Sequence, residues 1–147
     1  MWKPNVTVAA IAERDGRFLF VEEMSGKELV INQPAGHLEP NETLLHAVTR
    51  ETLEETGYHF VPTALVGVYY WHSQGKGITY LRFAFAGNIT AHEPERPLDT
   101  GIVRTSWFTP EALRKEAGRH RSPLVARCVD DYLMGKRFPL DLVTHLT

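Results

Sequence analysis

Alternating and clustered apolar residues divide the chain into short strands and a few helices. Val, Ile and Phe are concentrated in residues 5–12 and 17–23, and Asp15-Gly16 lies between the two runs. Because Asp-Gly adopts the positive φ angles of a tight hairpin turn at little cost, the pair predicts a β-hairpin. The same apolar patterning predicts further strands at residues 29–31, 63–72, 78–89 and 102–108.

Three helices are expected between and after these strands. The longest fits residues 42–56, where Asn41 is placed to cap the first free amides and Gly57 to end the helix in the left-handed conformation. Pro110 begins a short helix, and Ser122-Pro123 opens another that ends near Gly135. Because strands and helices mix irregularly, the pattern favours an α+β fold with a mixed sheet over a regular βαβ array.

The longest uninterrupted apolar run covers residues 64–71 and is expected to form a buried strand. A helix that spans a membrane needs about 20 apolar residues, and the N-terminal segment lacks the apolar region of a signal peptide. Cys128 is the only cysteine, which excludes an intramolecular disulfide and disfavours a cysteine zinc site. We therefore expect a cytoplasmic protein without a membrane partner.

Composition fits a packed globular domain, but the charge is unevenly distributed. The 147 residues are 43% hydrophobic and carry a formal net charge of −2, which gives no electrostatic case for binding a nucleic-acid polymer. Residues 36–58 nevertheless hold five acids and one base, whereas the rest of the chain holds fifteen bases and thirteen acids. This acidic segment is the feature that a functional hypothesis has to explain.

The acidic segment places three carboxylates on one face of the longest expected helix. Glu51, Glu54 and Glu55 fall within an arc of about 100°, and the apolar residues of the preceding turns lie on the same side. Carboxylates at this spacing repel one another, and acids near a helix C-terminus oppose the macrodipole. The face is either solvated, with Arg50 neutralising one acid, or it binds a divalent cation. Hard oxygen ligands suit Mg²⁺, with Mn²⁺ as an alternative.

The spacing of these acids matches the signature of the Nudix hydrolases, and the chain is identified as a member of that family. The identities stand at Gly36, Glu42, Arg50, Glu51, Glu54, Glu55 and Gly57. Thr52 and Tyr58 occupy positions where the signature prefers an aliphatic residue, which concerns packing more than chemistry. Other segments resemble a bacterial phosphatase of this family that acts on nucleoside di- and triphosphates and on hydroxymethylpyrimidine pyrophosphate; these segments are 3–4, 6–9, 32–39, 81–83 and 121–126.

The resemblance implies an α/β/α sandwich with a mixed sheet, formed by residues 1–147 as one domain. It also implies an enzyme in which Mg²⁺ neutralises a bound phosphoanhydride while water attacks a phosphorus. The metal ligands implied by position are Glu51, Glu54 and Glu55, with the Gly36 carbonyl as a further ligand and Glu42 as an outer one.

The resemblance also implies which groups move the proton. Arg50 would orient a carboxylate through a forked hydrogen-bond pair, and either Glu51 or Glu54 would act as the general base. A base from outside the signature is the alternative, for which the candidates are Asp99, Glu93 and Glu95. Asp99 is preferred among them because it precedes an expected strand, although a loop aspartate more often caps its own turn.

Cationic and aromatic residues in the resembling segments are the expected substrate contacts. Lys3, Arg82 and Arg121 would meet phosphate, unless they face solvent as most surface cations do. Trp71 would stack on a base, with Tyr70 and Trp2 as alternatives, or else belong to the core. His37 would meet phosphate or have a structural role, and the helix start at Ser122-Pro123 could face an anion.

The leading hypothesis is a phosphohydrolase that releases orthophosphate from a small nucleoside di- or triphosphate or a pyrimidine diphosphate. One alternative is cleavage at an internal phosphate, as in ADP-ribose or oxidised nucleotides. Another is a nucleotide-binding module that kept the fold and lost catalysis, and a purely structural acidic helix is the weakest. A monomer is favoured over a dimer.

Overall fold

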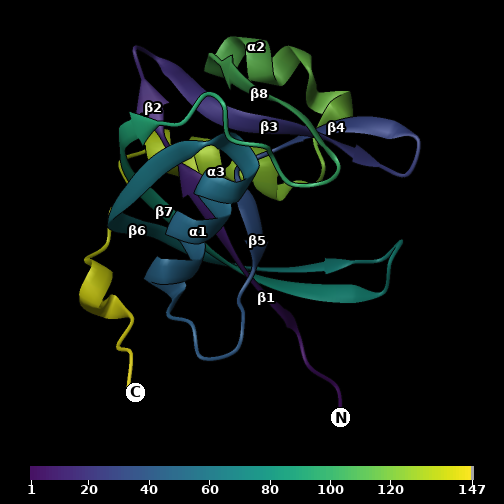
Figure 1. Cartoon of the computed structure of the whole chain (residues 1–147). Helices are drawn as coiled ribbons and strands as arrows, with labels where there is room; N and C mark the ends of the chain where they lie inside the picture. Colours follow the sequence, from purple (N-terminus) through teal and green to yellow (C-terminus); the bar gives the residue numbers. More distant parts are fainter. Residues whose placement is uncertain (147) are drawn as a thin grey trace.

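The computed structural model describes residues 1–146 and contains two β-sheets with helices packed against them (Figure 1). In the first sheet, β1 is parallel to β7 and antiparallel to β5, and β6 is antiparallel to β7. The mixed sheet expected from the sequence is thus confirmed. Its strands, in spatial order, are β5 (Ala35–His37), β1 (Asn5–Ile11), β7 (Ile78–His92) and β6 (Tyr58–Ser73).

The second sheet is built around β3 (Arg17–Ser25), which pairs antiparallel with three other strands. The expected hairpin turn is present, since Asp15 and Gly16 have φ angles of 54° and 78°. The other strands of this sheet are β2 (Glu13–Arg14), β4 (Glu28–Asn32) and β8 (Ile102–Phe108).

The central strand β1 explains why helices lie on both sides of the first sheet. Successive side chains of a strand point to opposite faces. Val8 therefore packs in the apolar cluster that includes α1 (Leu44–Thr56), whereas Ala9 packs in the cluster that includes α3 (Leu124–Leu133). Burial on both faces produces the layered α+β architecture that the sequence predicts.

Helix α1 begins two residues later than expected, and the predicted Asn41 cap is wrong. The Thr43 side chain accepts a hydrogen bond from the backbone N–H of His46 (3.1 Å), so Thr43 is the N-cap. Asn41 instead has a φ of 63°, which places it in a turn before the helix. The predicted C-terminal end is confirmed, because Gly57 has a φ of 76° and donates to the Leu53 carbonyl.

The two later helices begin where the prolines predicted. Thr109 caps α2 (Pro110–Lys115), and the Ser122 hydroxyl accepts from the Leu124 N–H at the start of α3. Two single-turn helices complete the elements, η1 (Ala117–Arg119) and η2 (Leu140–Leu142). None of the helices in residues 1–146 is long and apolar enough to cross a membrane.

The apolar run at residues 64–71 is not the fully buried strand that was predicted. Leu65 and Val66 are buried, but Val68 is 49% exposed and Tyr70 is 72% exposed. The reason is that β6 lies at the edge of its sheet and continues, with β7, into a long hairpin that projects from the body of the protein (Figure 1). Apolar composition alone could not distinguish this edge strand from a central one.

The C-terminal segment returns to the side of the fold where α1 lies. Phe138 exchanges two backbone hydrogen bonds with Leu65 (2.9 and 2.8 Å), and Leu140 packs on the apolar cluster that contains α1. The ring nitrogen Nε2 of His145 accepts from the N–H of Leu44, the first residue of α1 (3.2 Å). The segment thus supports the helix that carries the acidic residues.

We expect Leu140→Ala to lower the free energy of unfolding by about 1–2 kcal/mol. The loss is smaller than for a core leucine, because Leu140 is only partly buried and the truncation removes fewer apolar contacts. Leu142→Ala is the matched control, since Leu142 is 62% exposed and surface truncations usually change stability by less than about 0.5 kcal/mol. Urea denaturation of both variants measures the difference. Equal losses would show that the C-terminal segment does not pack as described.

Candidate active site

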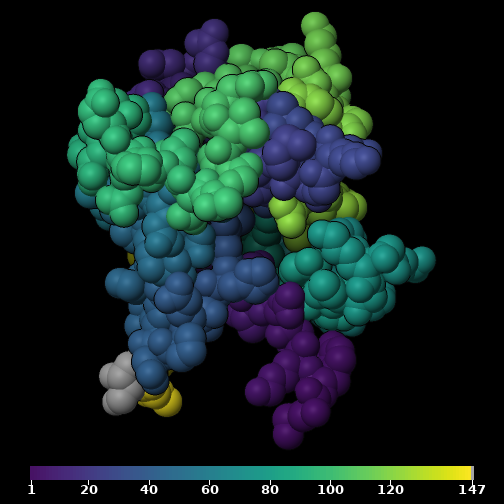
Figure 2. Space-filling model, turned by 45° about the vertical axis from the view of Figure 1, so that its right-hand side comes forward, coloured from purple at the N-terminus to yellow at the C-terminus, as the bar shows by residue number. Residues whose placement is uncertain are grey.

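A cavity of about 410 Å³ lies between α1, β5 and the projecting hairpin. Figure 2 shows the hollow beside the teal hairpin and the blue segment around α1. Acidic and basic side chains both line it: the acids include Glu23, Glu51 and Glu55, and the bases are Lys76, Arg82 and Arg121. A cavity of this composition can hold cations at one part of its wall and anionic groups at another.

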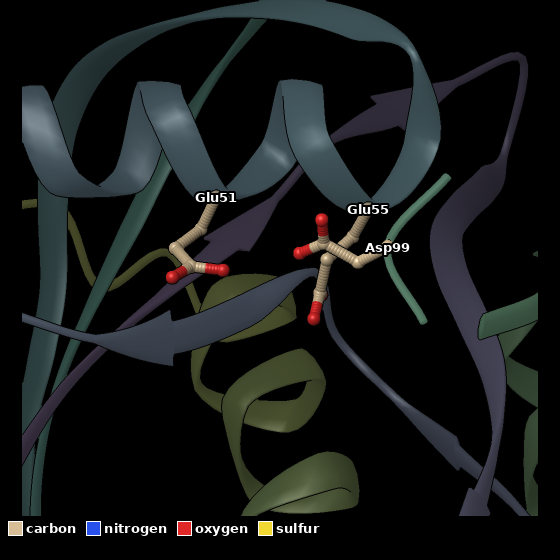
Figure 3. A group of neighbouring side chains, drawn as sticks. All are labelled: Glu51, Glu55 and Asp99. Atoms are coloured by element: carbon tan, nitrogen blue, oxygen red, sulfur yellow. The ribbon is translucent and has the colours of Figure 1, made fainter. Parts of the chain in front are cut away.

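Three carboxylates meet beside α1 (Figure 3), and two of them, Glu51 and Glu55, line the cavity. Glu51, Glu55 and Asp99 each offer an oxygen, and these oxygens lie within 4.8 Å of one another. The two glutamates lie one turn apart on α1. Asp99 comes from the loop before β8, where its backbone N–H donates to the Glu54 carbonyl (3.0 Å). A set of oxygen donors this close together suits a hard divalent cation such as Mg²⁺.

Gly36 leaves the space that the Glu51 carboxylate occupies. A Cβ atom at Gly36 would lie 2.0 Å from Cδ of Glu51 and 2.3 Å from each carboxylate oxygen. Any side chain at this position would therefore displace the carboxylate. The close approach also places the backbone of β5 against the acidic face of α1, as expected if the Gly36 carbonyl serves as a further ligand.

Burial of Glu55 raises the pKa of its carboxyl group to about 9, although the Ala35 N–H donates to it and lowers the value. The neighbouring charges of Glu23, Glu51 and Asp99 raise it further. The pKa of Glu51 is also raised, mainly by burial, and the Arg50 guanidinium opposes this. Crowded carboxylates with raised pKa values need an added positive charge to ionise together, so the donor set fits a divalent cation.

Arg50 gathers the other acids of the signature. Its Nε and Nη2 donate to the two oxygens of Glu42 (2.6 and 3.0 Å), and this ion pair lowers the pKa of Glu42 to about 2. Its Nη1 donates to Glu51 (2.9 Å) and to Glu54 (2.8 Å). Of the three acids that bind Arg50, only Glu51 belongs to the group of three carboxylates. The assignment of Glu42 and Glu54 as metal ligands stays a prediction.

Two of the three predicted phosphate-binding cations line the cavity. Arg82 is only 5% exposed, and its guanidinium donates to Gln33 Oε1 (2.9 Å) and Asn32 Oδ1 (3.0 Å). Within residues 1–146, Arg82 has no carboxylate partner and its Nε lacks a hydrogen bond. A buried cation without a counter-charge is costly, which favours an anionic ligand. Arg121 also faces the cavity, whereas Lys3 is exposed and outside its lining.

Aromatic residues form the hairpin side of the cavity. Trp71 stacks on Tyr80 with ring centroids 5.6 Å apart and an interplanar angle of 18°, and both residues line the cavity. His37 lines it as well. The alternative aromatic candidates Tyr70 and Trp2 are exposed and are not among the described residues that line it.

The three candidate bases outside the signature differ in their positions and contacts. Asp99 lies in the carboxylate group, whereas Glu93 is hydrogen-bonded to the His59 ring (2.5 Å) and Glu95 is exposed. The two departures from the signature are packing residues, as expected. Thr52 is buried with its hydroxyl donating to the Val48 carbonyl (2.7 Å), and Tyr58 is buried against His92.

Several cavity residues were not predicted from the sequence. They are Glu23, Asn32, Gln33, Lys76 and Tyr80, which line the cavity or hold Arg82. One signal was available: Glu22-Glu23 ends a run of four buried apolar residues in β3, and acids are rarely buried without partners. The other four residues carry no such signal, because their roles depend on which strands become neighbours.

Comparisons with known proteins agree with this geometry. The family model described as NUDIX domain matches residues 1–128. Phosphatase NudJ from Shigella boydii is 41% identical over 143 residues, which cover 97% of this chain and 92% of the relative, and NudJ from Escherichia coli K12 is 40% identical with the same coverage. A solved NUDIX hydrolase from Nitrosomonas europaea has a TM-score of 0.96 at 50% identity and covers 98% of both chains.

We expect Gly36→Ala to weaken Mg²⁺ binding at least tenfold, because the new Cβ would displace the Glu51 carboxylate. Gly118→Ala is the matched control, since a Cβ at Gly118 would meet no atom within 4 Å. Isothermal titration calorimetry with MgCl₂ measures both variants. Unchanged affinity in Gly36→Ala would remove Glu51 from the cation site.

The raised pKa of Glu55 predicts a pH dependence of stability in protein treated with EDTA. The folded state favours the protonated form of Glu55. The contribution of this group to the free energy of unfolding is therefore complete below a pH of about 4.5 and is lost as the pH rises towards 9. The melting temperature should therefore fall between pH 5 and pH 9, and Mg²⁺ should restore it at pH 8. Glu55→Gln should flatten the profile and remove the response to Mg²⁺; an unchanged profile in this variant would contradict the assignment.

Proposed function

This chain belongs to the NUDIX family and is a Nudix hydrolase, and on that premise we propose that it hydrolyses phosphoanhydride bonds of nucleoside di- and triphosphates with Mg²⁺, releasing orthophosphate. Hydroxymethylpyrimidine pyrophosphate is a further proposed substrate, and Mn²⁺ an alternative cation. The observation that carries this proposal is a cavity lined by two members of the carboxylate group, Glu51 and Glu55, and by the buried guanidinium of Arg82, which has no carboxylate partner among the described residues.

Glu51, Glu55 and Asp99 would hold the cation, with the Gly36 carbonyl as a further ligand. Bound there, Mg²⁺ would neutralise the substrate's negative charge and make its phosphorus more open to attack. The carboxylates are needed for a simple electrostatic reason. Without the cation, an acidic helix and a polyphosphate would repel each other.

Arg50 would keep the acids of the signature in place. Its donors join Glu51 and Glu54 through the same Nη1 atom, so the two carboxylates are held at fixed positions relative to each other. Because Glu51 belongs to the group of three, Glu54 is the acid of the signature that we assign as general base. Its side chain is about one-third exposed, which lets an accepted proton pass to solvent.

The cationic and aromatic residues of the cavity lining would bind the substrate. Arg82 and Arg121 supply charge for the phosphates, and the unpaired Nε of Arg82 is a donor in need of an acceptor. The stacked pair of Trp71 and Tyr80 offers an aromatic surface for a base. His37 also lines the cavity, and the contact assigned to Lys3 stays a prediction.

Orthophosphate release is favoured over internal cleavage by the relatives. The curated proteins at about 40% identity are named phosphatases. A UDP-X diphosphatase and an ADP-ribose pyrophosphatase share the fold at 18% and 13% identity, with TM-scores of 0.75 and 0.67, and such distant likeness shows the fold alone. An intact set of carboxylates argues against an inactive binding module.

The remaining expectations belong to the same proposal. We propose that the protein is a cytoplasmic monomer. We also propose that residues 1–147 act as one domain, because the segment from Phe138 to His145 packs against the same sheet and helix as the site. The substrates are small nucleotides, and no nucleic-acid polymer or membrane is involved.

A substrate panel tests the reaction. GTP, GDP, ADP-ribose and hydroxymethylpyrimidine pyrophosphate are incubated with the protein and Mg²⁺, and the phosphate products are separated by ion chromatography. We expect orthophosphate from both GTP and GDP. Pyrophosphate as the main product from GTP would favour internal cleavage, and nucleotide binding without turnover would favour the inactive module.

Glu54→Gln should lower kcat by about 10²–10⁴-fold, the usual effect of losing a general base, with the melting temperature unchanged. Glu95→Gln is the matched control, because Glu95 is an exposed acid that, unlike Glu54, forms no ion pair with Arg50 among the described residues. Steady-state kinetics on the best substrate of the panel measures both. Activity within threefold of the wild type in Glu54→Gln would move the role of base to another carboxylate.

A further inference from the structure

An ion pair that the Nudix signature does not contain lies at the cavity wall. Nη1 of Arg121 donates to Oε1 of Glu23 (2.7 Å), although the two residues are 98 positions apart in the chain. The Glu23 side chain is 14% exposed and that of Arg121 is 36% exposed. Both residues line the cavity, and neither belongs to the group of three carboxylates.

The residue before Glu23 anchors the same part of the chain. Glu22 is buried and accepts hydrogen bonds from Arg119 (2.8 Å), Arg104 (2.7 Å) and the Ser106 hydroxyl. The pairing of β3 with β8 shifts register between Glu22 and Glu23. At this irregularity, Glu22 holds Arg119 and Glu23 holds Arg121.

The backbone between these two arginines is fixed independently of the ion pairs. The N–H of Arg121 donates to the Ile31 carbonyl (2.9 Å), and His120 forms a parallel bridge with Ile31 of β4. His120 also contacts the Leu113 carbonyl through its ring (2.8 Å). Because the backbone is held in this way, the Glu23 contact chiefly sets the direction of the Arg121 side chain.

The pair leaves Arg121 able to bind a second oxyanion. A guanidinium has five N–H donors, and in the described residues the Arg121 side chain uses one of them, on Glu23. The remaining donors are available at the wall of a cavity that also contains the unpaired Arg82. A phosphate oxygen could therefore be bound without breaking the contact with Glu23.

We propose that Glu23 is a positioning residue that aims the free donors of Arg121 at a substrate phosphate. The pair then sets how tightly the substrate is held and takes no part in bond cleavage. This inference rests on the proposed function, because it needs a phosphorylated ligand in the cavity. The positioning role of Glu23 differs from a role in cation binding, because cation binding would require the negative charge of Glu23.

Substitutions of Glu23 separate these roles. Glu23→Ala removes the acceptor for Arg121, so KM should rise about tenfold with kcat within threefold of the wild type. Glu23→Gln keeps an oxygen at the same position without the charge, so it should restore KM to within threefold. Glu28→Gln is the matched control, since Glu28 is an exposed acid on the neighbouring strand β4.

A double-mutant cycle tests whether Glu23 acts through Arg121. Arg121→Ala should raise KM at least as much as Glu23→Ala, and the double variant should be no worse than Arg121→Ala alone. If Glu23→Ala does not fold, Glu23→Asp replaces it, because the shorter side chain withdraws the carboxylate from Arg121. Independent, additive effects in the cycle would overturn the proposal.

A binding measurement keeps this test separate from the test of the reaction. Calorimetry with methylenediphosphonate, a pyrophosphate analogue that is not hydrolysed, should show the same order of affinities across the variants in the presence of Mg²⁺. If the wild type binds it with this order but hydrolyses nothing in the panel, the proposed reaction fails and the positioning role stands. No binding by the wild type would overturn the positioning role, as would a 100-fold loss of kcat at constant KM in both Glu23→Ala and Glu23→Gln.

Discussion

The crowding of carboxylates on α1 is the constraint on which the site depends. Glu51, Glu55 and Asp99 offer oxygens within 4.8 Å of one another, and burial makes their joint ionisation unfavourable. The protein opposes this cost with neutral and cationic donors, the Ala35 N–H on Glu55 and Arg50 on Glu51. These contacts hold the carboxylates in place, and a divalent cation bound there would supply the charge that they lack.

The same constraint explains why β5 and the loop before β8 pack so closely on α1. Glycine at position 36 lets the strand approach the Glu51 carboxylate, and the Asp99 N–H ties the loop to the Glu54 carbonyl. Two cationic side chains of the cavity are each held by a residue distant in the chain, Arg82 by Gln33 and Arg121 by Glu23. The cavity is therefore lined by strands of both sheets, β1 and β5 of the first and β3 and β4 of the second.

Predictions from the sequence succeeded where the determining contacts are local. The positive φ of Asp15 and the C-terminal cap at Gly57 follow from residues within a few positions, and both are confirmed. The Asn41 cap was wrong because Thr43, two residues later, competes for the same amides. The exposure of Tyr70 could not be predicted, since nothing within β6 shows that the strand lies at a sheet edge.

The sequence by itself determined the family, the mixed fold and the acidic face of the helix, because helical spacing and a conformation-specific glycine are properties of short segments. Only the tertiary structure decided how the acids divide. Glu42 and Glu54 bind Arg50 and lie outside the group of three. Glu51, which also binds Arg50, meets Glu55 and Asp99, and Asp99 comes from a loop more than forty residues further along the chain. The pairing of Glu23 with Arg121 was decided in the same way. Such contacts depend on which strands become neighbours, and that is settled by packing of the whole core.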